Sequence, residues 1–182
     1  VNAEHDGKVS STNRKVDPIN SYLIREKGTK TVYFIEKGKK RKFPDAATFL
    51  SLGFKWGKVQ DLSRSAFNPV PIGSSIPSIN TTWLGAYFIN KSRSMPPKFI
   101  RPEAKVDMRW GGGAPGGIRR NNFSARFVRN VYFPVSGTYT FHVNVDDLAR
   151  VYIDGKNFLN KRCCPGQAVK KIPVGKGWHL LR

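Results

Sequence analysis

NFSARFVRNVYFPVSGTYTFHVNVDDLARVYIDG, residues 122–155, decides the fold class of this chain. Two runs within it carry an apolar or aromatic side chain at nearly every second position, and a turn sequence at residues 134–137 separates them. The first run contains Phe123, Ala125, Phe127, Val131 and Phe133, and the second contains Tyr139, Phe141, Val143 and Val145. Because a period of two places these side chains on one face of an extended chain, the pattern predicts two half-buried strands.

A third strand with the same alternation follows at residues 149–153. It ends at Asp154-Gly155, a dipeptide that favours the tight turn of a β-hairpin. No long helical period occurs after residue 80. Residues 83–182, hereafter the C-terminal unit, are therefore predicted to form an antiparallel β-sandwich or barrel.

A smaller unit is expected before it. Two apolar runs, Tyr22–Ile24 and Val32–Ile35, flank a polar stretch and predict a hairpin. Pro44-Asp45 then opens a short helix that ends at Gly53. The fold class is accordingly mainly β, with a sandwich preceded by a small hairpin-plus-helix module at residues 21–75, hereafter the N-terminal unit.

The remaining segments are expected to connect or precede these units. Residues 1–20 are polar and are predicted to be a leader or linker, and residues 76–82, rich in small and polar side chains, a second linker. The chain begins at Val1, which indicates a processed mature chain or a fragment. No apolar run approaches the roughly 20 residues of a membrane-spanning helix, so no membrane span is predicted.

The C-terminal unit resembles a known family. WLGAYFIN (83–90), VDMRWGGGAPGG (106–117), the stretch from residue 121 to 156 and GKGWHLLR (175–182) are similar, in this order, to the PA14 domain. That domain is a β-sandwich of bacterial toxins, glycosidases and microbial adhesins. The resemblance is most specific from Asn122 to Gly155. Because the family pattern continues past GWHLLR, we expect the domain to be incomplete at its C-terminal end.

The N-terminal unit has a resemblance of its own. YLIREKGTKTVYFIEKGKKRKFPDAATFLSLG (22–53) resembles a small module that is repeated in bacterial surface and wall-associated proteins. No enzymatic activity belongs to that module. The resemblance implies presentation or attachment at the cell envelope, and hence an extracellular or cell-surface location.

The PA14 resemblance also implies a site. In the sugar-binding members, two consecutive aspartates joined by a cis peptide hold a calcium ion, which in turn holds sugar hydroxyls. Asp146 and Asp147 match that pair, and Asn160 offers one further oxygen. Calcium binds several oxygen ligands, so these three residues are the candidate calcium and carbohydrate site.

Two features of the sequence oppose that interpretation. An Asp-Asp pair between strands also occurs as plain turn chemistry, with the carboxylates capping backbone amides. Leu148 replaces a glycine that is usual in the family, and Lys161 and Arg162 would repel a cation. Both interpretations of the aspartates stay open at this point.

The charge of the chain favours anionic partners. Thirty-two Lys and Arg face twelve Asp and Glu, which gives a net charge of +20. A dense basic run is the candidate for binding an anionic cell-wall polymer or nucleic acid, with a solvated hairpin surface as the alternative. It consists of Lys37, Lys39, Lys40, Arg41 and Lys42.

Function is predicted to be binding without catalysis. No nucleophile–base pattern is present, and two adjacent aspartates cannot act as opposed acid and base across a glycosidic bond. The favoured prediction is an extracellular or cell-surface module for calcium-dependent carbohydrate recognition or adhesion, with a glycan or an anionic cell-wall polymer as partner. The alternative is a self-associating subunit of a surface layer or filament. A weaker alternative is a nucleic-acid binder, although neither unit resembles a nucleic-acid-binding fold.

Overall fold

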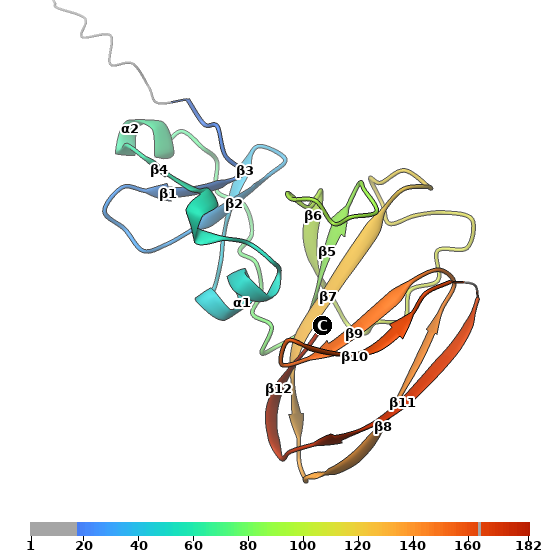
Figure 1. Cartoon of the computed structure of the whole chain (residues 1–182). Coiled ribbons are helices and arrows are strands. Elements are labelled where there is room, and N and C mark those ends of the chain that lie inside the picture. Colours follow the sequence, from blue (N-terminus) through green and yellow to red (C-terminus); the bar gives the residue numbers. More distant parts are fainter. Residues whose placement is uncertain (1–17, 164) are drawn as a thin grey trace, which may run out of the picture.

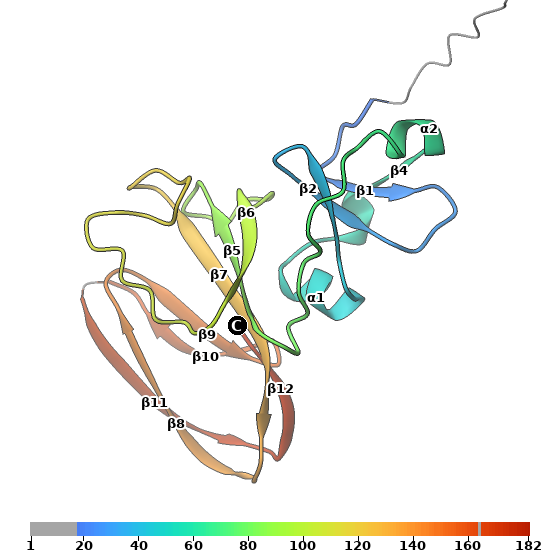
Figure 2. The same ribbon diagram turned by 180° about the vertical axis from the view of Figure 1, so that it is seen from behind.

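The computed structural model describes residues 18–163 and 165–182. Residues 1–17, most of the predicted leader, and Cys164 lie outside the described residues. Two β-rich bodies lie side by side, joined near residue 80 (Figures 1 and 2). No helix in the described part is long and apolar enough to cross a membrane.

The N-terminal unit is built on a four-stranded sheet in the order β3-β2-β1-β4. β1, β2 and β3 pair antiparallel, as the predicted hairpin requires, whereas β4 runs parallel to β1. Its strands are β1 (Leu23–Glu26), β2 (Tyr33–Glu36), β3 (Lys39–Lys42) and β4 (Val59–Leu62). Three short helices accompany them: α1 (Ala46–Ser51), η1 (Trp56–Lys58) and α2 (Arg64–Phe67).

Helix α1 begins and ends at the predicted signals. The Asp45 side chain accepts a hydrogen bond from the backbone N–H of Thr48 at 2.6 Å and so caps the first turn. Gly53 follows the helix with a φ of +91°, in the left-handed region that favours glycine. The helix predicted from Pro44-Asp45 to Gly53 is therefore confirmed.

The C-terminal unit contains a six-stranded sheet, β10-β9-β12-β7-β5-β6, and a two-stranded sheet, β11-β8. All pairings are antiparallel. The strands are β5 (Trp83–Phe88), β6 (Phe99–Glu103), β7 (Ser124–Phe133), β8 (Gly137–Val145), β9 (Ala149–Ile153), β10 (Lys156–Lys161), β11 (Gly166–Val174) and β12 (Gly177–Leu181).

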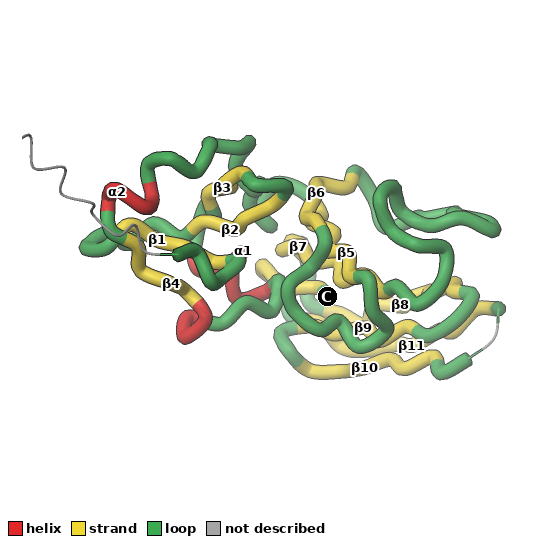
Figure 3. The backbone as a smooth tube through the Cα atoms, turned by 90° about the horizontal axis from the view of Figure 1, so that it is seen from above, coloured by secondary structure: helices red, strands yellow, loops and turns green. Residues whose placement is uncertain are grey.

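Figure 3 shows the course of the strands of this unit, and aromatic rings connect its two sheets. Phe133 of β7 meets Tyr139 of β8 with ring centroids 4.7 Å apart, and Phe141 of β8 meets Phe158 of β10 at 4.8 Å. These are the alternating side chains that the sequence placed on one strand face. The predicted class, mainly β with an antiparallel sandwich, is confirmed.

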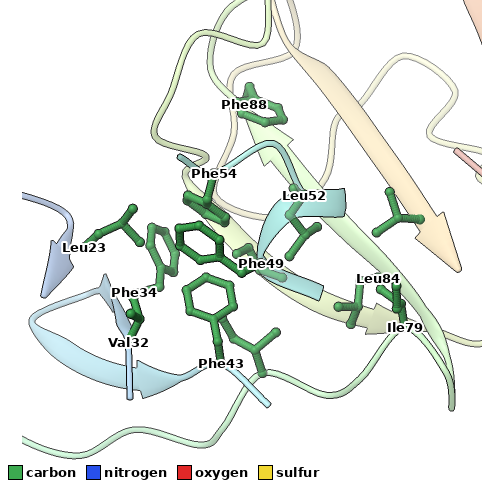
Figure 4. Packing of buried hydrophobic residues seen from close by; sticks show 14 residues of the cluster. Leu23, Val32, Phe34, Phe43, Phe49, Leu52, Phe54, Ile79, Leu84 and Phe88 are labelled. Carbon is green, nitrogen blue, oxygen red and sulfur yellow. The ribbon is translucent and has the colours of Figure 1, made fainter. Parts of the chain in front are cut away.

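One hydrophobic core joins the two units (Figure 4). The aromatic rings of the N-terminal unit pack toward the face of β5 that carries Leu84 and Phe88. Phe49 of helix α1 has no exposed surface, and its ring centroid lies 5.2 Å from that of Phe43 and 5.5 Å from that of Phe54.

The segment predicted to be a linker takes part in the same core. Ile76 and Ile79 each expose only 1% of their surface and belong to the same buried cluster. The backbone of this segment is also fixed, because Asn130 of β7 donates its N–H to the carbonyl of Ile79 at 2.9 Å. Each unit therefore supplies part of the core that buries the other.

A histidine–carboxylate contact ties the β9–β10 turn to β12. Nδ1 of His179 lies 2.6 Å from Oδ2 of Asp154, and Nε2 lies 3.1 Å from the carbonyl of Gly175. The hydrogen bond with Asp154 raises the pKa of His179 above its ordinary value. Burial raises the pKa of Asp154, but the hydrogen bonds from His179 and the Leu180 N–H outweigh it, so that pKa is lowered overall.

This contact predicts a pH-dependent contribution to stability. Because the folded pKa of His179 exceeds the unfolded value of about 6.5, its contribution is fully present below pH 6.5 and is lost as the pH rises through the folded pKa. We expect wild type to exceed His179→Gln in stability by up to about 1 kcal/mol at pH 5.5 and by less at pH 8.5. Urea unfolding at both pH values measures the difference, and a gap that does not shrink would contradict the assignment.

Candidate functional site

Asp146 and Asp147 lie where the chain crosses between the two sheets. β8 belongs to the two-stranded sheet and β9 to the six-stranded one, so the pair does not form the tip of a hairpin. Both side chains are exposed, and neither forms a hydrogen bond or ion pair with another described residue.

The crossing brings few charged oxygen ligands together. The peptide bond between the two aspartates is trans, since the cis bond found among the described residues is Met95–Pro96. Within residues 18–163 and 165–182, no three His, Cys, Asp or Glu side chains gather as a metal-binding group. Calcium takes six to eight oxygen ligands. Asp146 and Asp147 supply only part of such a shell, so the calcium site that the family resemblance implies stays a prediction.

A pocket of about 620 Å³ lies beside this crossing, on one face of strands β9 and β10. Figure 1 shows these two strands at the edge of the six-stranded sheet. The lining residues come from β9, β10 and the residues flanking them: Leu148, Arg150, Tyr152, Asn157, Asn160, Lys161 and Arg162. Asn160, a predicted carbohydrate ligand, is among them, but Asp146 and Asp147 are not.

The strand register explains why these side chains meet. Tyr152 lies opposite Asn157 and Arg150 opposite Asn160, with an irregularity between Asn157 and Leu159. Residues directly opposite each other in a sheet share a face. The extra residue of the bulge brings Asn160 opposite Arg150, in place of the apolar Leu159.

Hydrogen bonds hold the bulge in place. Nδ2 of Asn157 donates to the carbonyl of Val151 at 3.1 Å and to that of Leu159 at 3.3 Å. Nδ2 of Asn160 donates to Oδ1 of Asn157 at 2.7 Å. The two amides are thus fixed to the backbone and to each other, and the neutral wall of the pocket is formed before any ligand arrives.

The charged wall of the pocket is entirely basic. Arg150, Lys161 and Arg162 line it, and no carboxylate does. Arg150 and Arg162 are exposed, and neither forms a hydrogen bond or ion pair with another described residue. Nζ of Lys161 donates to the carbonyl of Cys163 at 2.6 Å, which holds the ammonium near the pocket rim.

Further arginines continue from the pocket across the same sheet face. The guanidinium of Arg182 lies 4.2 Å from the ring centroid of Tyr152. Nη1 of Arg126 donates to the carbonyl of Leu52, at the end of helix α1. Burial, together with the positive charges of Arg182 and Arg93, lowers the pKa of Arg126 to about 10. The face that bears the pocket therefore carries a positive field reaching to the N-terminal unit.

The basic run of β3 is partly structural, because two of its five members contact the fold. Lys40 is 4% exposed, its Nζ donates to the carbonyl of Phe67 at 2.8 Å, and burial lowers its pKa. Nη1 of Arg41 lies 2.8 Å from Oε2 of Glu36 and also donates to the carbonyl of Ile100 at 2.7 Å. Lys40 and Arg41 therefore stabilise the fold.

The other members of the basic run, Lys37, Lys39 and Lys42, are exposed. The inward orientation of Lys40 follows from the alternation of side chains along a strand, a signal that the run of like charges obscures. The sequence also did not reveal the role of Arg150 and Tyr152, because the facing residues are set by the bulge in β10.

A family of known proteins matches the C-terminal unit. The description of the matching family is "PA14 domain", and its match extends over residues 85–176. This segment runs from β5 through β11 and includes the whole pocket. The resemblance found in the sequence is thereby confirmed for the C-terminal unit.

One curated protein and two solved structures are similar to parts of this chain, and the curated protein is named as a regulator. The chain is 33% identical over 78 residues to the "Anti-sigma-I factor RsgI3" of Acetivibrio thermocellus, a match that covers 42% of this chain and 12% of that protein. One solved structure, titled "anti-sigma factor domain-containing protein from Clostridium clariflavum", is 28% identical with a TM-score of 0.49 and covers 62% of this chain and 40% of its own. A second, an "anti-sigma factor domain-containing protein", is 26% identical with a TM-score of 0.49 and covers 55% and 36%.

These comparisons correct the predicted function. The prediction of a module for carbohydrate recognition or adhesion, and its alternative of a surface-layer or filament subunit, are wrong, because the curated relative is an anti-sigma factor. The partners inferred with that function, a glycan or an anionic cell-wall polymer, are corrected with it. The chain spans about an eighth of the length of that relative.

Proposed function

This chain belongs to the PA14 domain family through residues 85–176, and from that premise we propose that it is a ligand-receiving region of a regulator that controls a sigma factor. The observation that carries the proposal is its 33% identity to part of an anti-sigma-I factor. In this role the chain acts by binding and not by catalysis, and it lies outside the cell or at the cell surface.

The architecture supports such a role. A receiving region needs a ligand pocket and a physical connection from that pocket to the rest of the protein. The pocket on β9 and β10 includes Tyr152, and Arg182 lies over its ring. The positive charge of Arg182 acts on the guanidinium of Arg126 and lowers its pKa. Arg126 in turn donates a hydrogen bond to the carbonyl of Leu52 at the end of helix α1. A change of charge at the pocket thus has a short path to the N-terminal unit.

The test is a transcription reporter in cells that express the full-length protein. The sigma factor is first identified by co-purification with the full-length protein. We expect deletion of residues 21–182 to change the output of a promoter that depends on this sigma factor several-fold, with the protein level unchanged on an immunoblot.

A matched control separates regulation from damage to the rest of the protein. Leu50→Ala alters an exposed side chain of helix α1 and is expected to leave the reporter output as in wild type. An output that is the same with and without residues 21–182 would overturn the proposal. So would the failure of any sigma factor to co-purify with the full-length protein.

A further inference from the structure

We propose that the pocket on β9 and β10 is a binding site for a small dianionic oxyanion, either a phosphate group or a dicarboxylate. The inference names the ligand class of the region described above and to that extent rests on the proposed function. Its chemical basis is the pocket alone.

The positive charge of the pocket lining is the first argument. Three cationic side chains, Arg150, Lys161 and Arg162, converge on a space that no carboxylate lines. An arginine guanidinium presents paired N–H groups that match two oxygens of a carboxylate or phosphate. Because Arg150 and Arg162 form no ion pair or hydrogen bond with another described residue, both guanidinium groups are available to a ligand.

The shape and rigidity of the pocket are the second argument. A volume of about 620 Å³ lies within the range of small-molecule sites. Asn157 and Asn160 are held by the hydrogen bonds across the bulge, and Tyr152 forms an aromatic wall with the Arg182 guanidinium over its ring. Preorganised polar groups bind an anion without a large ordering cost.

The position of the pocket is the third argument. It lies next to the crossing where the family resemblance predicts a calcium ion, and it includes Asn160 from that predicted set. The two aspartates lie outside it, whereas three cations lie within it. A divalent cation would be repelled here and an anion attracted, so the charge preference of the site is the opposite of the one that the resemblance implies.

Calorimetric titration of the full chain tests the proposal. Inorganic phosphate and succinate are added separately at low ionic strength in a buffer that contains neither. We expect saturable binding of one or both, and the preferred probe identifies which of the two chemistries the site takes. Arg150→Gln and Arg162→Gln are each expected to weaken binding about tenfold, the loss of one charge-assisted contact.

A matched variant distinguishes a site from general charge attraction. Arg109→Gln removes the same charge from an exposed side chain that does not line the pocket, and it should leave affinity unchanged. Far-UV circular dichroism confirms that every variant is folded. Equal weakening by Arg109→Gln, or no saturable binding of either anion, would overturn the proposal.

A calcium titration of the same chain tests the alternative, in which the site prefers a cation. Saturable calcium binding that disappears in Asp147→Asn would overturn the proposed sign of the site. All of these titrations measure affinity in solution, whereas the reporter measures regulation. The ligand class and the regulatory role can therefore fail separately.

Discussion

Phe49→Ala is expected to destabilise the whole chain by about 3–5 kcal/mol, the cost of removing a fully buried aromatic ring from a packed core. The ring of Phe49 packs against Phe43 and Phe54 and stacks on Trp56 with centroids 4.1 Å apart. The ring of Phe49 is fully buried, so its removal combines the loss of burial with the cost of the cavity left behind. Guanidinium unfolding followed by circular dichroism measures the change.

The number of unfolding transitions tests the shared core more directly than the size of the destabilisation does. Because the core contains residues of both units, including Leu84 of β5, both should unfold in one transition in wild type and variant alike. Leu50→Ala, on the exposed side of the same helix, should cost well under half as much. A variant that loses only the N-terminal unit, in a separate transition, would contradict the shared core.

Gly53→Ala is expected to cost about 2–3 kcal/mol, more than the same change at Gly28. Both glycines have left-handed backbones, with φ of +91° and +87°, so an alanine pays a similar backbone penalty of about 1 kcal/mol at either position. At Gly53 the new Cβ would lie 1.8 Å from Nη1 of Arg126, whereas nothing lies within 4 Å at Gly28. The Arg126 guanidinium must then leave the carbonyl of Leu52, which removes a charge-assisted hydrogen bond.

A double-mutant cycle isolates that contact. In an Arg126→Ala background the guanidinium that a Cβ at residue 53 would meet is absent. Gly53→Ala should then lower the free energy of unfolding by no more than Gly28→Ala does in wild type. Thermal or urea unfolding of the four proteins gives the coupling free energy. An additive result, with the full cost of Gly53→Ala retained without Arg126, would show that the contact between the two units contributes nothing there.

Local patterns in the sequence predicted the individual elements well. Asp154-Gly155 predicted a tight hairpin, and both residues adopt positive φ, at 48° and 80°, as such a turn requires. The alternation in residues 122–155 predicted β7, β8 and β9. These signals succeed because a turn or a strand depends on neighbouring residues alone.

Interactions between distant residues escaped the same reasoning. Ile76 and Ile79 stand among serines, prolines and asparagines, and their burial depends on rings supplied some thirty residues away. The sequence did not predict the pocket for a related reason. A single bulge in β10 decides that Asn160, and not Leu159, lies opposite Arg150. The sequence also did not show that the chain crosses between the two sheets at Asp146 and Asp147, because local pattern does not reveal which sheet each strand joins.

The division of one core between two units also limits how this gene can be rearranged. A recombination event that breaks the chain within residues 76–82 would separate Phe49 from Leu84 and leave each product with an uncovered apolar face. Such products expose the kind of surface that leads to aggregation. The shared core therefore favours keeping the two units together as a single piece.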